Sequence, residues 1–408
     1  MQAITFDGAI PRYLLTRAAG ALSTRFLAGP GRCTFRAEVA EPELPGPSWV
    51  RIRTRLGGVC GSDLNLVRLS VSPSASPFSS FPFVVGHENV GVVSAVGEKV
   101  TKVRPGDRVV ANPLLACGVR GIDPPCARCA TGRVATCEKF TEGVLAPGML
   151  IGTTRGLGGS WGEVFVAHED QVHAPPGSVS DEAALLLEPF ATVLSPLVSH
   201  PPGERVLVIG AGTIGLLAVA ALKALAPARR VTVLARHGFQ AESAEELGAD
   251  RIVRASGGSN HFDELAEAGG TRLLVPILGK RVGVGGFDAT IVCTGGSSAV
   301  DDALRFTRGG GQIVLLGNVA RLPGVDWTPL WMKELTIQGS ICYNGPLHAG
   351  VGQDTFGRGL SLLAGGWAEK LGKLVTHRLP LRELDRALAL SFDRGQSGAI
   401  KVAFDLRG

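Results

Sequence analysis

Residues 205–225 read RVLVIGAGTIGLLAVAALKAL, and this stretch decides the fold of the second half of the chain. Its centre has the pattern G-x-G-x-x-G, with an apolar strand-like run before it and an apolar helix-like run after it. In that context glycines permit a tight turn and a close approach of the backbone to a pyrophosphate, which the N–H groups of the helix N-terminus bind. The alternative is a turn that binds nothing. We predict a dinucleotide site formed by Gly210, Gly212, Thr213, Ile214 and Gly215.

Strand-like and helix-like segments alternate around this motif. Further predicted strands are RRVTVLAR (229–236), FDATIVCTGG (287–296), GGGQIVLLGN (309–318) and LTIQGS (335–340). Such alternation predicts a doubly wound parallel sheet covered by helices on both faces. Residues 30–115 instead contain short β-branched runs broken by Gly and Pro, which are typical of a β-rich domain. We expect a first domain over 1–190, a cofactor domain over 191–341, and a return segment over 342–408 that completes the first domain.

The end of the second predicted strand indicates which dinucleotide binds. An acidic residue is expected there when the ribose 2′-hydroxyl is bound, but this strand ends Leu234-Ala235-Arg236. Arg236 would pair with a 2′-phosphate, so we predict NADP over NAD. The alternative is that Arg236 is a solvated charge at a strand end. Thr294, after the strand FDATIV, is a further candidate for cofactor contact.

Composition excludes several classes of function. The chain has 408 residues, of which 45% are hydrophobic and 19% are charged, so it can bury a large core. Its net charge of +5 is spread over the whole length, which argues against a nucleic acid or a membrane surface as partner. The longest uncharged apolar stretch, 206–222, is shorter than the ~20 residues of a membrane-spanning helix. The first residues lack the pattern of a secretory signal, and we expect a cytoplasmic protein.

Four of the eight cysteines cluster between positions 117 and 137. Cys126 and Cys129 form a C-x2-C pair, Cys137 follows, and Cys117 lies nine positions before the pair. Four thiolates complete a closed tetrahedral zinc shell, which predicts a structural zinc site. Regular spacing would instead place the first ligand at Asp123, and we keep that residue as the alternative.

A second set of possible zinc ligands is dispersed along the chain. Cys60 lies in GGVCGSD, His87 and Glu88 lie in VVGHENVG, and Glu188 opens a Glu-Pro pair. One thiolate, one imidazole and one carboxylate leave a coordination position open, as in catalytic zinc sites. Asp63 could hydrogen-bond the far nitrogen of His87. Each residue also has an ordinary alternative: a buried Cys, a core His or a capping Glu.

These motifs together resemble those of the zinc-containing medium-chain dehydrogenases, the alcohol and polyol dehydrogenase family. The matching segments are CGSD at 60–63, GHE-x2-G-x5-G-x2-V from 86 to 100, GDRV at 106–109, the four cysteines, LEPFA at 187–191, GAGTIG and ELGAD. The Glu-Pro at Glu188 is similar to the sorbitol and threonine dehydrogenase branch. The resemblance implies a GroES-like β catalytic domain, a Rossmann cofactor domain, and a homodimer or homotetramer.

The resemblance also implies roles for individual residues. Cys60 and His87 would hold a catalytic zinc, and Glu88 and Glu188 would share the carboxylate role, with the choice of ligand left open. Ser62 would pass the alcohol proton outward, and Asp63 would be the partner of His87. Many members have histidine at the position of Asn65, which cannot titrate. Extra residues appear near 9–30, 66–82, 141–158 and 270–285.

We therefore expect reversible oxidation of a small-molecule alcohol to its carbonyl, with two zinc ions per chain and NADP, or else NAD, as hydride carrier. Two zinc-free or inactive alternatives remain: an enone or quinone reductase of the same fold, and a non-catalytic NADP-binding paralogue. A third possibility is a biosynthetic step on a large natural product, for which the extra loops would make room.

Overall fold

A computed structural model describes residues 1–255, 261–345 and 354–407. The chain divides into two compact units. Unit 1 comprises Met1–Glu188 and Tyr343–Gly408, and unit 2 comprises Pro189–Cys342. Within the described ranges, no helix combines the length and the apolar character needed to span a bilayer.

Unit 2 is built on a six-stranded parallel sheet with the order β11-β10-β9-β14-β15-β16. The strands are β9 (Arg205–Ile209), β10 (Arg230–Ala235), β11 (Arg251–Arg254), β14 (Phe287–Val292), β15 (Thr307–Leu315) and β16 (Thr336–Gly339). Numbered within the sheet, this order is 3-2-1-4-5-6, the doubly wound arrangement that binds dinucleotides where the order reverses. The predicted parallel sheet is confirmed.

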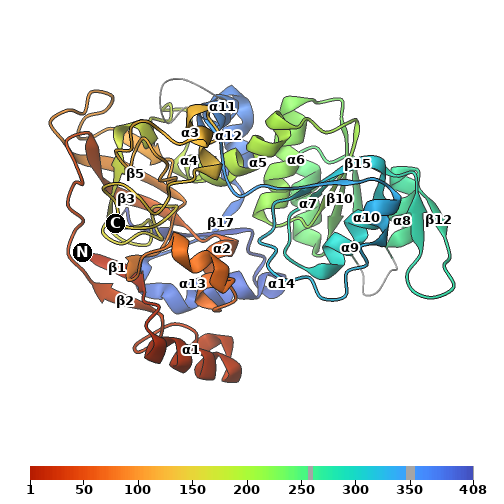
Figure 1. Cartoon of the computed structure of the whole chain (residues 1–408), viewed down its shortest axis with the longest axis horizontal. Coiled ribbons are helices and arrows are strands. Elements are labelled where there is room, and N and C mark those ends of the chain that lie inside the picture. Colours follow the sequence, from red (N-terminus) through yellow and green to blue (C-terminus); the bar gives the residue numbers. More distant parts are fainter. Residues whose placement is uncertain (256–260, 346–353, 408) are drawn as a thin grey trace. The chain divides into compact units, whose positions relative to one another are not determined.

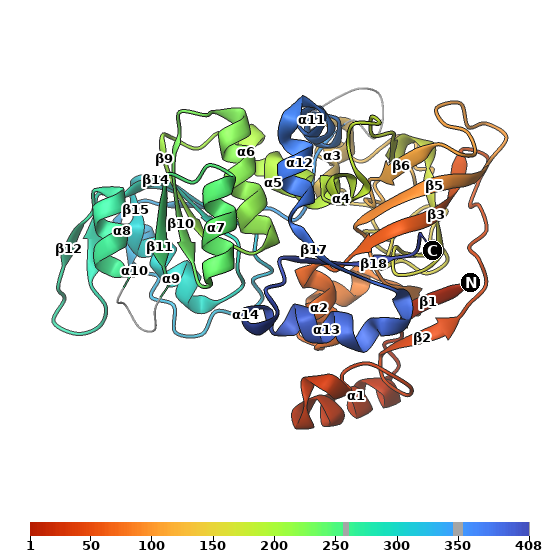
Figure 2. The same cartoon turned by 180° about the vertical axis from the view of Figure 1, so that it is seen from behind.

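Helices cover both faces of this sheet. They are α6 (Thr213–Leu225), α7 (Gly238–Glu246), α8 (Phe262–Gly269), α9 (Ser297–Phe306) and α10 (Thr328–Met332), and α5 (Leu187–Ser199) leads into the unit. In Figure 1, α9 and α10 lie on the near side of the sheet, and in Figure 2, α6 and α7 do. Because both faces are covered, strands such as β9 are buried almost along their whole length.

Unit 1 contains a larger, mostly antiparallel sheet. Its strands are β3 (Trp49–Gly58), β5 (Asn89–Val96), β6 (Arg108–Ala111), β7 (Val164–His168), β8 (Val172–His173), β17 (Val375–Leu379) and β18 (Lys401–Asp405). A second sheet has three strands, β1 (Gln2–Phe6), β2 (Thr34–Glu38) and β4 (Phe83–Val84). The C-terminal strand β18 pairs with β3, with Phe404 opposite Gly57, so the end of the chain completes the unit that its beginning started.

Short helices connect the strands of unit 1. They are α2 (Gly61–Val67), α3 (Ala127–Ala130), α4 (Asp181–Leu185), α11 (Thr355–Leu362), α12 (Ala368–Gly372), α13 (Leu384–Phe392) and α14 (Arg394–Ser397). One hydrophobic core joins α2, α13 and β18 around residues such as Leu64, Leu388 and Phe404. Two of the extra segments form elements of their own: helix α1 (Ile10–Leu22) in unit 1, and the hairpin of β12 (Arg272–Leu274) and β13 (Val282–Val284) in unit 2.

Candidate active site and metal centres

Three of the dispersed residues meet in unit 1. Cys60 follows β3 and caps the N-terminus of α2, while His87 and Glu88 lie in the loop that enters β5. One ligand atom from each of Cys60, His87 and Glu88 lies within 4.8 Å of the other two. Zinc–ligand bonds are about 2.0–2.3 Å long, so a single ion can contact all three.

Glycines allow these segments to approach each other. A Cβ on Gly58 would lie 2.0 Å from Glu88 Oε2, and a Cβ on Gly57 would lie 2.0 Å from the carbonyl oxygen of Ser160. Gly86, directly before His87, has a φ of +102°, which side-chain-bearing residues rarely adopt. The glycines of GGVCGSD and VVGHE are therefore what lets the carboxylate and the imidazole lie against β3.

Asp63 holds two of the three candidate ligands. Its Oδ2 accepts a hydrogen bond from the backbone N–H of Cys60 at 2.9 Å, and its Oδ1 lies 3.5 Å from His87 Nδ1. This contact leaves Nε2 of His87 for a metal. Burial by itself lowers the pKa of His87, but Asp63 and Cys60 outweigh it and raise that pKa well above its usual value.

Glu88 has a partner that the sequence did not indicate. Lys401 Nζ lies 2.6 Å from both carboxylate oxygens of Glu88, and it also donates to the carbonyl oxygen of Val59 at 3.2 Å. Both charged side chains are almost completely buried. The only signal for Lys401 was a single charge inside the apolar strand AIKVAF, 313 positions after Glu88.

Glu188 lies near this cluster but is not one of the three converging ligands. It is buried at the start of α5. Burial raises the pKa of Glu188 to about 7, the negative charge of Glu88 adds to that rise, and the charges of His87 and Lys401 and a hydrogen bond with Tyr343 oppose it. Glu188 is therefore a carboxyl group that can change its protonation state near neutral pH.

Ser62 presents a hydroxyl to this region. Its Oγ is buried and has no hydrogen-bond partner in the parts of the chain that the structure describes. A buried polar atom of this kind is costly unless a ligand satisfies it. Asn65, one turn further along α2, has its Oδ1 3.4 Å from Ser70 Oγ.

The four clustered cysteines also converge. The sulfurs of Cys117, Cys126, Cys129 and Cys137 all lie within 4.8 Å of one another, and Asp123 is exposed outside the cluster. Cys117 Sγ is 3.6 Å and Cys126 Sγ is 4.0 Å from Cys137 Sγ. A tetrahedral zinc with bonds of ~2.3 Å needs sulfurs about 3.8 Å apart, so this arrangement fits the ion.

Backbone N–H groups and one buried cation surround the sulfurs. Lys139 N donates to Cys137 Sγ at 3.4 Å, and a hydrogen bond from Cys129 is the main reason that the pKa of Cys137 falls to about 5. Burial is the main reason that the pKa of Cys117 rises to about 11. The fully buried Arg120 donates to carbonyl oxygens of Leu115 and of residues in 142–148, which ties the neighbouring loop to the cluster.

The predicted dinucleotide turn has the expected geometry in unit 2. Gly210 follows β9 with a φ of +94°, and Gly212 is the N-cap of α6. A Cβ on Gly215 would lie 1.8 Å from the carbonyl oxygen of Gly210, so only glycine allows the helix to start this close to the turn. Thr294 lies beside the same turn, because its Cγ2 is 3.3 Å from the position of a Cβ on Gly210.

Arg236 is exposed at the C-terminal end of β10. On the adjacent strand β11, Arg254 pairs with Ala235 and donates from Nη2 to the carbonyl oxygen of Arg236 at 3.1 Å. Two guanidinium groups therefore lie at the ligand-binding ends of neighbouring parallel strands. Arg254 could not be identified from the sequence, because the pairing register of the two strands is set by the fold.

Known proteins share these features. Residues 46–177 match the alcohol dehydrogenase GroES-like domain, and residues 213–364 match the zinc-binding dehydrogenase domain. An L-threonine 3-dehydrogenase of Anaeromyxobacter sp. (strain Fw109-5) is 30% identical over 358 residues, which is 87% of this chain and 91% of the relative. The chain belongs to the zinc-type medium-chain dehydrogenases. The predicted family, fold class and zinc-dependent, nicotinamide-linked alcohol oxidoreductase activity are thereby confirmed.

Solved dehydrogenase structures agree with this assignment. The NADP-bound crystal structure of a Sinorhizobium meliloti 1021 protein is 25% identical, with a TM-score of 0.70, over 91% of this chain and 96% of that one. An alcohol dehydrogenase from Escherichia coli CFT073 in complex with NADH is also 25% identical, with a TM-score of 0.71, over 100% of this chain and 99% of that one. Both forms of the nicotinamide cofactor thus occur among the structural relatives of this dehydrogenase.

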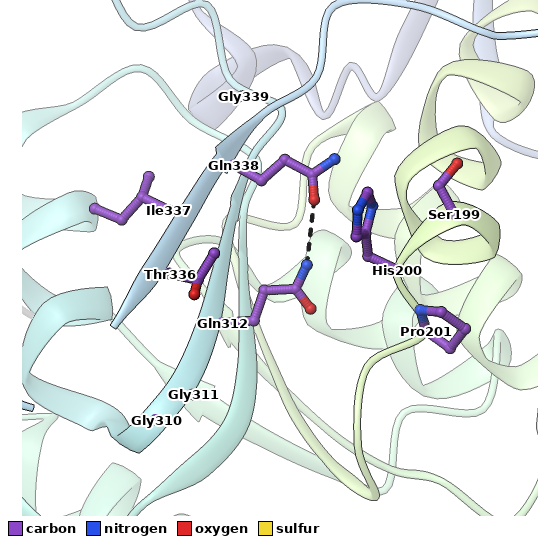
Figure 3. A pocket seen from close by; sticks show the side chains of 10 residues that line it. All are labelled: Ser199, His200, Pro201, Gly310, Gly311, Gln312, Thr336, Ile337, Gln338 and Gly339. Carbon is purple, nitrogen blue, oxygen red and sulfur yellow. Dashed lines mark hydrogen bonds between the residues drawn. The ribbon is translucent and has the colours of Figure 1, made fainter. Parts of the chain in front are cut away.

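One hollow of the dehydrogenase lies apart from these residues. It follows the edge strand β16 in unit 2 and is lined by residues that include His200, Gln312 and Gln338. Figure 3 shows the two glutamine side chains facing each other, with Gln312 Nε2 donating to Gln338 Oε1 at 3.3 Å. The hollow contains none of the predicted metal-ligating or cofactor-binding residues, so we assign it no role in the reaction.

Proposed function

We propose that Cys60, His87 and Glu88 hold the catalytic zinc of an alcohol dehydrogenase that uses NADP. The observation that carries this proposal is the convergence of three ligand atoms of different chemistry within 4.8 Å, beside a buried hydroxyl that lacks a partner. Zinc bound there supplies a Lewis acid that lowers the pKa of an alcohol hydroxyl. A nicotinamide bound in unit 2 would supply the acceptor for a hydride from the carbinol carbon.

The residues around the cluster then have separate tasks. Asp63 lies beside Nδ1 of His87, which leaves Nε2 as the ring nitrogen that would face the metal. Ser62 Oγ accepts the hydroxyl proton of the substrate. Asn65 cannot carry that proton further because its amide does not titrate. The proton therefore leaves through water or another group. Lys401 places its ammonium group against the carboxylate of Glu88, and Glu188 supplies a second carboxyl group that is able to take or give a proton near neutral pH.

We further propose that Cys117, Cys126, Cys129 and Cys137 hold a structural zinc, which makes two zinc ions per chain. The spacing of the four sulfurs supports one zinc at this cluster, in addition to the one proposed at Cys60, His87 and Glu88. Elemental analysis of the purified protein should give two zinc ions per chain, and one or none would contradict the proposal. A value of one would indicate a paralogue that has lost one site, and none would indicate a zinc-free reductase.

The substrate class is a small-molecule alcohol or its carbonyl. Relatedness to an L-threonine 3-dehydrogenase makes L-threonine one candidate in a screen that also includes diols, polyols and simple alcohols. Absorbance of NADPH reports turnover in both directions. Zinc-dependent turnover of one class of alcohol supports the proposal, whereas reduction of enones without zinc would overturn it. We also infer a cytoplasmic homodimer or homotetramer, which sedimentation analysis of the enzyme tests.

NADP preference rests on Arg236 and Arg254. Charge-assisted hydrogen bonds contribute about 1.5–3 kcal/mol, so Arg236→Ala should raise the KM for NADP at least tenfold and leave the KM for NAD nearly unchanged. Arg251→Ala is the matched control, because Arg251 lies at the opposite end of β11, where it pairs with Glu267. Equal KM values for NAD and NADP in the unmodified enzyme, with no change in Arg236→Ala, would refute the preference.

A further inference from the structure

Helix α1 is attached to unit 1 by polar contacts. Among its residues only Thr16 and Ala19 are buried. Thr16 Oγ1 accepts the backbone N–H of Cys33 at 2.9 Å and donates to the carbonyl oxygen of Arg12 at 2.8 Å. Arg12 forms an ion pair with Asp7 at 3.1 Å and lies over the ring of Phe35. These contacts fix which face of the helix is turned toward the protein.

The opposite face of α1 is apolar and uncovered. Ile10 is 74% exposed, Leu14 is 62% exposed and Leu22 is 82% exposed, and Phe26 directly after the helix is half-exposed. A surface helix normally turns its apolar residues toward the core, so this arrangement is the reverse of the usual one. Figures 1 and 2 both show α1 projecting beyond β1 and β2, with no other element of unit 1 over its outer face.

The segment that contains α1 is also locally cationic. No acidic residue occurs between Asp7 and Glu38, whereas five arginines do: Arg12, Arg17, Arg25, Arg32 and Arg36. Arg17 and Arg25 are exposed, and neither forms an ion pair with any residue that the structure describes. The net charge of +5, counted over all 408 residues, does not reveal this local excess of positive charge.

The size and charge of the outer face of α1 indicate whether it fits a protein surface or a lipid bilayer. A helix of 13 residues is about 20 Å long and ~10 Å wide, so it offers about 200 Å², far less than the ~800 Å² per partner of a stable protein interface. A second copy packed on the same face would also bring two cationic segments together. A helix with an apolar face and arginines beside it can instead enter the boundary of an anionic bilayer.

We propose that α1 is an interfacial anchor through which the enzyme binds reversibly to anionic lipid bilayers. Leu14, Leu22 and Phe26 enter the boundary between headgroups and acyl chains, and Arg17 and Arg25 contact the lipid phosphates. Binding is weak and falls with ionic strength, because one short helix supplies little apolar area and the charges are screened. This role does not depend on the catalytic assignment.

Sedimentation of the full-length enzyme with large vesicles tests the anchor. One set of vesicles is an equimolar mixture of phosphatidylserine and phosphatidylcholine, and the other is phosphatidylcholine alone. We expect binding to the first set only, an at least tenfold loss in Leu14→Asp/Leu22→Asp, and a smaller loss in Arg17→Gln/Arg25→Gln. Turnover of a soluble alcohol checks that the variants are folded.

The β12–β13 hairpin provides the matched control. Its tip exposes Ile277 and Leu278 fully or almost fully, and they lie in unit 2. Ile277→Asp/Leu278→Asp should leave vesicle binding unchanged; an equal loss there would mean that any exposed apolar residue adheres to lipid, and would overturn the proposal. Absence of binding to the anionic vesicles would also overturn it. A change of oligomeric state in Leu14→Asp/Leu22→Asp would assign the face to a protein contact instead.

Discussion

The two clusters of unit 1 that we propose to bind zinc differ in how they are built. The four cysteines come from one short stretch, have four ligands of one kind, and are surrounded by backbone N–H groups. Cys60 comes from one segment and the adjacent pair His87 and Glu88 from another; the three differ in chemistry and have ionisable neighbours in Lys401 and Glu188. The first cluster is closed and suits a structural ion, whereas the second has the open position and adjustable charges that chemistry needs.

The buried cations beside the two clusters sharpen this contrast. Arg120 directs its guanidinium hydrogen bonds to carbonyl oxygens, so it connects a loop to the cysteine lobe. Lys401 directs its ammonium group to the carboxylate of a candidate ligand. Replacing Arg120 should therefore loosen the loop at 142–148 from the four-cysteine cluster. Replacing Lys401 should change the charge beside Cys60, His87 and Glu88.

The largest effect on activity should come from the open cluster. Cys60→Ser removes a thiolate ligand, and we expect turnover to fall by more than the ~100-fold that loss of an outer-shell partner costs. Zinc content should fall from two ions to one per chain, and NADP binding measured by fluorescence should be nearly unchanged. Full turnover in a Cys60→Ser protein with one zinc would show that the two clusters do not differ in this way.

The largest effect on stability should come from the closed cluster. Cys137→Ser removes a candidate ligand whose thiol pKa is lowered, mainly by a hydrogen bond from Cys129. We expect the free energy of unfolding of unit 1 to drop by more than about 5 kcal/mol, with loss of one zinc per chain. Urea denaturation measures this change. A stability loss in Cys60→Ser as large as that in Cys137→Ser would contradict the division between a structural and a catalytic site.

Lys401→Met tests the charge balance of the open cluster. Removing one partner of a buried ion pair typically costs about 3–5 kcal/mol, because the remaining charge is buried without compensation. The double variant Glu88→Gln/Lys401→Met should regain part of that loss, since it removes both charges. Urea unfolding midpoints of both variants in a Cys60→Ser background, where the open cluster holds no zinc, compare them directly. If the double variant is no more stable than the single one, Lys401 acts through packing and not through its charge.

The pH dependence of zinc binding is the smallest expected difference. His87 must lose a proton to bind zinc, and because its pKa in the metal-free chain is raised, acidification below that pKa should weaken binding at the open cluster about tenfold per pH unit through His87, beyond the proton that the Cys60 thiol releases on binding. Above that pKa His87 has no proton to lose, so it no longer makes the zinc affinity depend on pH. At the closed cluster Cys117 and Cys129 both have raised pKa values, so two protons leave and the slope should be about 100-fold per unit.

Competition with a coloured chelator measures both slopes. The Cys60→Ser protein reports the closed cluster alone, and the difference from the unmodified enzyme reports the open one. A pH slope at the open cluster that does not steepen on acidification below the raised pKa of His87 would show that His87 is not protonated in the metal-free chain.

Features encoded within a short stretch were predictable. The turn at Gly210 could be recognised because a strand, the glycines and a helix follow one another directly, and the parallel sheet followed from the same alternation. Cysteine spacing likewise indicated a metal site, although the choice between Cys117 and Asp123 needed the coordinates. Lys401 and Arg254 could not be predicted, because their partners are set by strand register and by packing between distant segments.

The amino-acid sequence by itself determined the parallel sheet, the pyrophosphate turn and the short motifs that supply candidate zinc ligands, because each depends on neighbours within one or two turns or strands. Only the tertiary structure decided that Glu88 faces Lys401, that Arg254 lies beside Arg236, and that the apolar face of α1 points outward. These arrangements arise from contacts between segments far apart in the chain, whose distances no local pattern specifies.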